Sequence, residues 1–366
     1  MSTLFSDDYP QARRRFLDAA RDAGATLSSY HNDGADGRVS EPLHTDVAWL
    51  GPRSAARVMV TVSGTHGVEG YTGSACQLRL LTSGLVARVP ADTALLLVHA
   101  LNPYGFAHDR RVNEDNVDLN RNFVDHDRLP ANDGYPEVHS FLVPSNWEGP
   151  ERAAADEALM AIAAKRGVRH LQSVITAGQW THPDGLFHGG TRPVWSHHVL
   201  DDITRGHLTG REQVAYVDLH TGLGERAAGE PIFRGGRDRG AIERARSWYG
   251  PALTTSEHGT SSSTPIVGNT ATLLADVLRG GELLTAITLE FGTLPGIEVL
   301  SALRADNWLA LQPEGTVAPE LHRLIKRQIR AAFYPDEADW RDAVLTRADT
   351  VLAQTLTGLT TNAATT

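Results

Sequence analysis

The segment from Val60 to Gly70 places a histidine and a glutamate three residues apart, directly after an apolar run. Its sequence, VTVSGTHGVEG, predicts a buried strand that ends in a glycine-rich loop carrying His66 and Glu69. An imidazole nitrogen and a carboxylate oxygen presented together are two of the ligands that zinc binds in proteins. Alone, a His-x-x-Glu motif is a weak signal in a chain with 16 histidines and 44 acidic residues. Its significance depends on the polar clusters farther along the chain.

Three further polar clusters lie in or directly after apolar runs. They are NEDNVDLNRNF at residues 113–123, VDLHTG at residues 217–222 and TLEFGT at residues 288–293. In α/β proteins, ligand and catalytic groups gather at the ends of neighbouring strands. We therefore expect these clusters and the His-x-x-Glu loop to meet at one edge of a sheet.

A third metal ligand is needed, because catalytic zinc usually takes three protein ligands and leaves one position for water. His220 is the first candidate, since it follows the apolar residues 214–219 and precedes a Thr-Gly pair. The alternative for His220 is a core histidine bonded to the backbone, and His99 and His188 compete with it as ligands. Asp218 would point to the same face of the strand as His220, either as its hydrogen-bond acceptor or in a structural role.

The expected general base is Glu290, which follows the strand residues 287–289, where a carboxylate contributes little to stability. Such a base would activate the attacking water. A cation is also needed beside the oxyanion that forms during amide hydrolysis. Arg110 and Arg111 are the candidates, and their neighbouring positions leave the choice between them open.

Asn120 and Arg121 form a pair that suits a planar carboxylate. A guanidinium group binds a carboxylate through two parallel hydrogen bonds, and the amide adds a further donor. Salt bridges to nearby aspartates such as Asp118 are the alternative for these arginines. The number of arginines in the cluster favours substrate binding.

The order of these residues resembles the zinc metallocarboxypeptidase superfamily, which includes carboxypeptidase A-like enzymes and aspartoacylase-like deacylases. The resemblance covers roughly residues 57–293, and its clearest signatures are VDLNRNF at residues 117–123 and TLEFGT at residues 288–293. Within the superfamily, the chain is most similar to a poorly characterised bacterial branch of carboxypeptidase-like proteins.

The resemblance implies a fold and a set of residue roles. The implied fold is a mixed, mostly parallel eight-stranded sheet between helices, with one Zn²⁺ per chain. The implied roles are zinc binding by His66, Glu69 and His220, acid–base catalysis by Glu290, oxyanion stabilisation by Arg111 or else Arg110, and substrate carboxylate binding by Asn120 and Arg121.

The chain departs from the family pattern where substrates are selected. Residues 264–275 contain no tyrosine in the stretch where carboxypeptidases carry one that covers the substrate, and residues 123–147 and 178–198 have no clear counterpart. We therefore expect a zinc-dependent hydrolase that cleaves a peptide or amide bond next to a free carboxylate, as a metallocarboxypeptidase. The alternative is an N-acyl-amino-acid deacylase. A zinc-retaining binding protein without turnover is a third interpretation, which Glu290 and the arginines disfavour.

Composition restricts the partners of the protein. The net charge of −10 disfavours nucleic acids and anionic membranes, so we expect a small peptide or N-acyl amino acid as the substrate. The N-terminus lacks the features of a signal peptide, and no apolar run is long enough to cross a membrane. Cys76 is the only cysteine and is expected to be an apolar helix residue. These features predict a cytoplasmic protein.

The hydrophobic pattern predicts a single catalytic domain over residues 1–366, with a core at about 40–335 and a helical extension at about 336–357. Strands are expected at residues 47–50, 56–62, 93–98, 214–219 and 286–289. Helices are expected at residues 9–25, 73–85, 153–165, 319–333 and 337–356. Loops are expected at residues 123–147, 178–198 and 254–264, and a frayed tail at residues 358–366.

Overall fold

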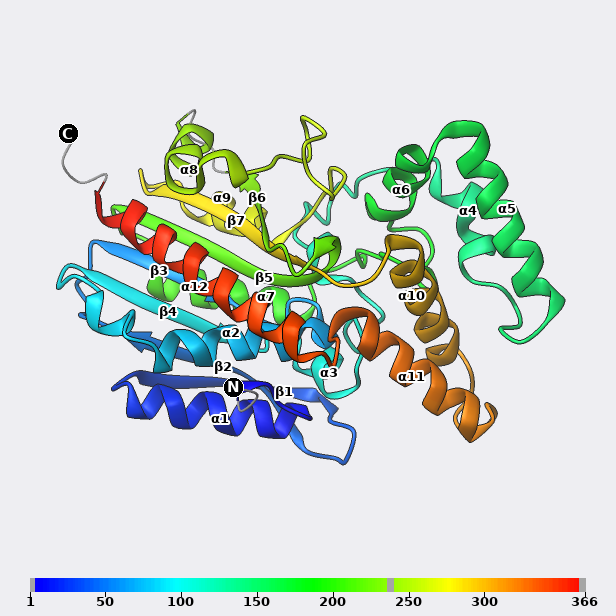
Figure 1. Cartoon of the computed structure of the whole chain (residues 1–366), viewed down its shortest axis with the longest axis horizontal. Coiled ribbons are helices and arrows are strands. Elements are labelled where there is room, and N and C mark those ends of the chain that lie inside the picture. Colours follow the sequence, from blue (N-terminus) through cyan, green and yellow to red (C-terminus); the bar gives the residue numbers. More distant parts are fainter. Residues whose placement is uncertain (1–3, 236–239, 362–366) are drawn as a thin grey trace.

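A seven-stranded sheet crosses the centre of the computed structural model, which describes residues 4–235 and 240–361 (Figure 1). The strand order is β1-β2-β4-β3-β5-β7-β6. Three neighbouring pairs are parallel (β3–β4, β3–β5 and β5–β7) and three are antiparallel (β1–β2, β2–β4 and β6–β7). The strands are β1 (Thr26–Asp36), β2 (Pro42–Leu50), β3 (Arg57–Val62), β4 (Thr93–His99), β5 (Gln213–Arg226), β6 (Glu230–Gly235) and β7 (Leu283–Gly292).

Helices cover both faces of this sheet. One face packs against α1, α2, α8 and α12, and the other packs against α7 and α9 (Figure 1). The α-helices are α1 (Tyr9–Asp22), α2 (Gly70–Thr82), α3 (Pro103–Ala107), α4 (Tyr135–Leu142), α5 (Pro150–Arg166), α6 (Val168–Thr176), α7 (Trp195–His207), α8 (Ala241–Tyr249), α9 (Thr270–Val277), α10 (Gly296–Ala310), α11 (Pro319–Phe333) and α12 (Ala338–Thr361).

The central strands are buried on both faces, which explains their continuous apolar sequences. In β3, Met59 belongs to the core cluster on the α2 and α12 face, whereas Val58, Val60 and Val62 belong to the cluster on the α7 face. Successive side chains of a strand point to opposite faces, so each strand contributes to both cores. The polar residues that follow these strands are therefore held at the end of a rigid sheet.

Two features of the expected sheet were wrong. The described residues form seven strands and not eight. The sheet is mixed, as expected, but it is not mostly parallel, because it has as many antiparallel as parallel pairs. The sequence pattern also missed β1 and β6, which are the two edge strands. Most of β1 is exposed, and β6 has only six residues, among them a proline, an arginine and a glycine. Neither strand carries the apolar signal of the buried strands.

The expected helices largely match. Helix α11 has the expected bounds, and α12 continues to Thr361, past the start of the expected frayed tail; residues 362–366 lie outside the described residues. The loop expected at residues 123–147 contains α4, and the loop at residues 178–198 ends in the first turns of α7. Within residues 4–235 and 240–361, every helix is too short or too polar to cross a membrane.

Helices α4, α5 and α6 form a lobe at one end of the molecule, beside α10 and α11 (Figure 1). The lobe and the two neighbouring helices share one core cluster, in which Tyr135, Leu142, Ile329 and Phe333 are fully or almost fully buried. This lobe follows strand β4 and its polar loop in the chain, and it borders the site described below.

Candidate metal centre and active site

The His-x-x-Glu loop lies between the end of β3 and the start of α2. Its backbone is tied to the segment that carries the two arginines, because Gly67 donates to the carbonyl of Arg111 (3.1 Å) and Val68 donates to that of Arg110 (2.8 Å). Gly67 lies so close to α3 that an added Cβ would be 2.0 Å from the carbonyl carbon of Gly105. The loop therefore fits only with glycine at this position.

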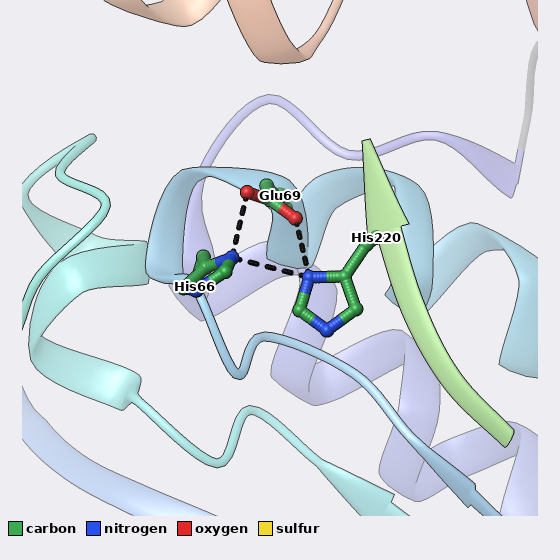
Figure 2. Close-up of side chains that lie close together, drawn as sticks. All are labelled: His66, Glu69 and His220. Atoms are coloured by element: carbon green, nitrogen blue, oxygen red, sulfur yellow. Dashed lines mark hydrogen bonds and ion pairs between the residues drawn. The ribbon is translucent and has the colours of Figure 1, made fainter. Parts of the chain in front are cut away.

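His66, Glu69 and His220 converge on one point from the β3 loop and from β5 (Figure 2). The Nδ1 atom of His66 lies 2.9 Å from Oε1 of Glu69, and the Nδ1 atom of His220 lies 2.8 Å from Oε2. The two Nδ1 atoms are 3.1 Å apart. All three side chains are buried, and the arrangement offers two nitrogens and one oxygen to a single ion, which is a donor set that suits zinc.

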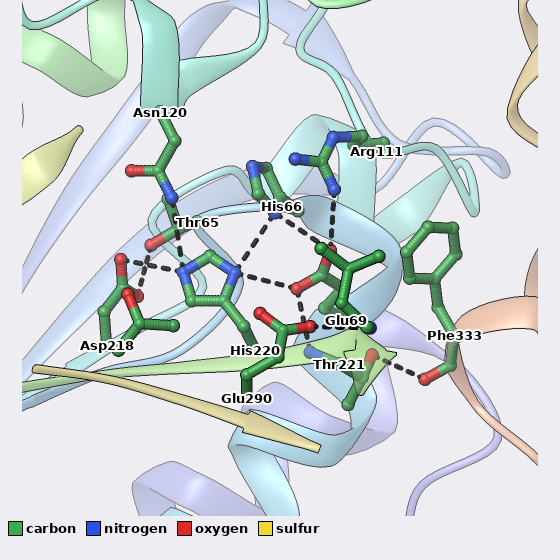
Figure 3. A network of polar contacts seen from close by, with 12 residues as sticks. Thr65, His66, Glu69, Arg111, Asn120, Asp218, His220, Thr221, Glu290 and Phe333 are labelled. Atoms are coloured by element: carbon green, nitrogen blue, oxygen red, sulfur yellow. Dashed lines mark hydrogen bonds and ion pairs between the residues drawn. The ribbon is translucent and has the colours of Figure 1, made fainter. Parts of the chain in front are cut away.

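A buried carboxylate holds each histidine from its other ring nitrogen. Asp118 Oδ1 lies 3.1 Å from Nε2 of His66, and Asp218 Oδ2 lies 2.9 Å from Nε2 of His220. Asp218 is fixed in turn by the hydroxyl group of Thr65, which donates to it at 2.7 Å (Figure 3). Such outer acceptors orient a histidine and make it a more basic ligand, so both Nδ1 atoms are prepared to face an ion.

The electrostatic field at this point favours a cation. Burial opposes a charged imidazole, but the charges of Asp218 and Glu69 outweigh it and raise the pKa of His220 to about 10. Burial likewise opposes the carboxylate of Glu69, but His66 and His220 lower its pKa well below the usual value. The group is therefore compatible with metal binding in its charge as well as in its geometry.

Glu290 lies on β7 directly opposite His220 on β5, because the two residues are partners in the parallel register (Figure 3). Its Oε1 atom accepts a hydrogen bond from the backbone N–H of Leu223 at 3.0 Å. Burial, followed by the charge of Glu69, raises the pKa of Glu290. A buried carboxyl group whose pKa is raised in this way is suited to accept and return a proton.

The structure separates the two adjacent arginines. Arg111 donates to Oε1 of Glu69 at 3.1 Å and to Oδ2 of Asp118 at 3.0 Å, and it lines the cavity around Glu290. Arg110 points elsewhere and donates to Asp306 at 3.1 Å. Arg110 is therefore not brought to the candidate site.

Asn120 and Arg121 both reach the cavity, but with different environments. The amide of Asn120 lies 3.3 Å from Nε2 of His220, so it is already engaged with a candidate ligand. Arg121 donates to the carbonyls of Thr176 and Asn120, and its nearest ion-pairing oxygen, on Asp118, is 3.9 Å away. Burial lowers the pKa of Arg121 to about 10. It is a buried cation without a close anion.

Arg234 on β6 is a further cavity arginine that the sequence pattern did not reveal. It donates hydrogen bonds to hydroxyl groups, including that of Thr288 at 2.9 Å, and forms no ion pair with a carboxylate of the described residues. Burial lowers its pKa. Its sequence context, PIFRG, contains no motif that would have identified it.

These side chains share one cavity of about 80 Å³. Its lining combines the three candidate ligands, the carboxylate of Glu290 and three arginines with an apolar side. The lining residues that carry these groups are His66, Glu69, Arg111, Asn120, Arg121, His220, Arg234, Glu290, Phe187, Leu223, Val299, Leu303 and Phe333.

The competing candidates lie outside the group of three candidate ligands. His99 is buried against Phe16, with ring centroids 4.4 Å apart, and its Nε2 atom contacts the hydroxyl of Ser74 at 3.0 Å. His188 is also buried, but it is not part of the metal-compatible group found among the described residues. Cys76 is buried in α2, as expected.

Several solved structures are similar to this protein in fold. Thrombin-activatable fibrinolysis inhibitor matches with a TM-score of 0.51 and 12% identity, over 97% of this chain and 74% of that chain. The bovine protein in complex with tick carboxypeptidase inhibitor gives a TM-score of 0.49 and 12% identity, over 98% of both chains. Carboxypeptidase A from Helicoverpa armigera gives 0.44 and 12% identity, over 90% and 74%. The fold is carboxypeptidase-like, in agreement with the fold class that the sequence resemblance implied.

The chain belongs to the family described as protein of unknown function DUF2817, whose family model matches residues 5–347. No match was found among curated proteins.

Proposed function

We propose that this protein is a zinc-dependent hydrolase that cleaves an amide bond next to a free carboxylate. The observation that carries the proposal is the combination found in one cavity. A buried His-Glu-His group faces a carboxyl group with a raised pKa. Beside them lie the buried Arg121, whose nearest carboxylate oxygen is 3.9 Å away, and the half-buried Arg234, which forms no ion pair with a described carboxylate. The first group suits a metal ion, the second suits proton transfer, and the arginines suit an anionic substrate.

His66, Glu69 and His220 would hold the zinc ion. When bound, zinc would act as a Lewis acid and lower the pKa of a water molecule. Glu290 would take a proton from the attacking water and return it to the leaving amine. The backbone N–H of Leu223 keeps this carboxylate in position.

Arg111 would stabilise the oxyanion that develops on the scissile carbonyl. Its Nε and Nη1 atoms are bonded to Asp118 and Glu69, and Nη2 has no hydrogen bond to a described residue. An anchored guanidinium with one free edge is a preorganised donor, which costs little reorganisation during the reaction.

Arg121 would bind the free carboxylate of the substrate, and Arg234 would contribute a second positive charge. Arg121 is buried and Arg234 is half-buried, and withdrawing a charge from water without a close partner costs free energy. A substrate carboxylate would supply the missing anion. Asn120 would keep His220 oriented from the same segment.

The proposal is tested with protein that is stripped of metal by a chelator and reloaded with zinc. Dipeptides and N-acetyl amino acids are supplied as free acids and as the matching C-terminal amides, and released amino acid is measured. We expect release from the free acids by reloaded protein alone. No release from any free acid, or equal release by the stripped protein, would contradict the proposal.

A further inference from the structure

A large apolar groove adjoins the catalytic cavity. Its volume is about 550 Å³, and five residues line both spaces: Thr176, Phe187, Leu223, Val299 and Leu303. The two spaces therefore adjoin at these residues. Most of the groove's lining comes from α5, α6 and α10, and Figure 1 shows where these helices lie.

The groove is lined mostly by apolar side chains, with Gln172, Thr176 and Ser262 as its polar members and no charged residue among its described lining. Met160, Val168 and Ile297 on its rim are exposed by 63%, 72% and 62%. Few other large apolar side chains among the described residues are as exposed, and these three gather at one opening. A concentrated exposed apolar surface of this kind marks a binding site for an apolar group.

The groove begins beside the reacting groups. Leu223 lines the groove and donates its backbone N–H to Glu290, and the ring of Phe187, which lines both spaces, lies 5.2 Å from the guanidinium carbon of Arg111. Arg121 and Arg234, in contrast, line the catalytic cavity and not the groove. The positive charges therefore line the cavity, and the uncharged surface lines the groove. The two meet where Arg121 donates to the carbonyl of Thr176 and lies 5.5 Å from the ring of Phe187.

We propose that the substrate is an amino acid whose nitrogen carries a long aliphatic acyl chain, and that this chain lies in the groove. This inference rests on the proposed function. Water would add its oxygen to the acyl carbon, the C–N bond would break, and the amine would take up the proton. The products would be a fatty acid and a free amino acid.

The kind of substrate follows from the positive charges of the cavity and the apolar lining of the groove beside it. An N-acyl amino acid has one carboxylate for the arginines and one uncharged chain for the groove. A longer peptide would place polar amide groups along an apolar wall, where unpaired polar groups cost free energy. The acyl chain is the part that such a wall stabilises.

The first measurement is binding to the zinc-loaded Glu290→Gln protein, with N-acyl derivatives of one amino acid from acetyl to dodecanoyl. Each buried methylene is worth about a fourfold change in Kd. We expect Kd to fall on the order of 100-fold between butanoyl and octanoyl. The same series should raise kcat/KM in the wild-type protein. A flat dependence on chain length would overturn the inference.

The second measurement tests whether the acyl chain of the substrate lies in the groove. Met160→Asp with Ile297→Asp puts two charges on the exposed rim, where folding should tolerate them. We expect this double variant to lose the gain from chain length and to keep its activity on the acetyl substrate. The matched control is Leu324→Asp, an exposed leucine on α11 outside the groove, which should keep the gain.

The outcomes separate this inference from the proposed function. A chain-length gain that survives in the double variant would overturn the groove assignment, as would faster cleavage of dipeptides than of long-chain N-acyl amino acids. Chain-length-dependent binding without hydrolysis of any member would support the groove and contradict the hydrolase. Hydrolysis of the acetyl compound without a chain-length effect would support the hydrolase and contradict the groove.

Discussion

Arg121 offers the sharpest test of how the substrate is held. Its guanidinium is buried, hydrogen-bonded to backbone carbonyls and 3.9 Å from its nearest ion-pairing oxygen, on Asp118. The change is Arg121→Met, which keeps an apolar stem of similar length and removes the charge. If a substrate carboxylate is the missing anion, the variant loses a hydrogen bond to a charged group.

Such a hydrogen bond is worth about 1.5–3 kcal/mol, which corresponds to roughly 10- to 150-fold in binding. We expect KM for an N-acyl amino acid to rise by this factor. The matching amide has no carboxylate, so its KM should change little. The preference for the acid over the amide should therefore fall by roughly the same factor. The assay is release of the amino acid or its amide by zinc-loaded protein.

The control for this experiment is Arg110→Met. Arg110 lies outside the cavity, and its partner Asp306 keeps an ion pair with Lys326 at 2.6 Å. This variant should keep the acid-to-amide ratio of the wild type. An equal loss on acid and amide in Arg121→Met would refute the reasoning, because it would show that Arg121 only supports the structure around Asp118 and Thr176.

Three further predictions follow from the same geometry. His220→Ala removes one of three converging ligands, so zinc measured by elemental analysis should fall sharply; full retention would move the third ligand elsewhere. Glu290→Gln should keep zinc but lower kcat by roughly 10²- to 10⁴-fold, since the amide cannot accept the proton. Burial lowers the pKa of His99 from 6.5 to about 4. As the pH falls, the unfolded state therefore takes up a proton at His99 before the folded state does. The contribution of the neutral His99 to stability is complete above about pH 6.5 and is lost as the pH falls towards 4. Between pH 7.5 and pH 4.5, the free energy of unfolding measured in urea should fall by about 2–3 kcal/mol less in His99→Gln than in the wild type. An equal fall in the two proteins would contradict this prediction.

The centre of the site could be predicted because its residues follow buried parallel strands. Such strands have continuous apolar sequences, and their register is shared, so His220 and Glu290 become direct neighbours. The ligand loop after β3 could be found for the same reason. The structure separates the two adjacent arginines, which the sequence could not do. Arg111 turns into the cavity, whereas Arg110 turns towards Asp306.

The periphery of the site could not be predicted in the same way. Arg234 lies on a short edge strand whose sequence carries no periodic apolar signal. The groove is formed by helices from residues 150–176 and 296–310, which meet through tertiary packing alone. Helix bounds can be read from local patterns, but the space between two helices depends on how each packs against the rest of the protein.

The close approach of Gly67 to Gly105 has a consequence for sequence variation within the family. A side chain at position 67 would meet backbone and not a flexible group, so the chain could not absorb it by a change of rotamer. The loop would have to move, and with it His66 and Glu69. Glycine at this position is thus a marker that can be read in any relative: where it is replaced, the two candidate ligands cannot occupy the arrangement seen in this protein unless α3 has been rebuilt.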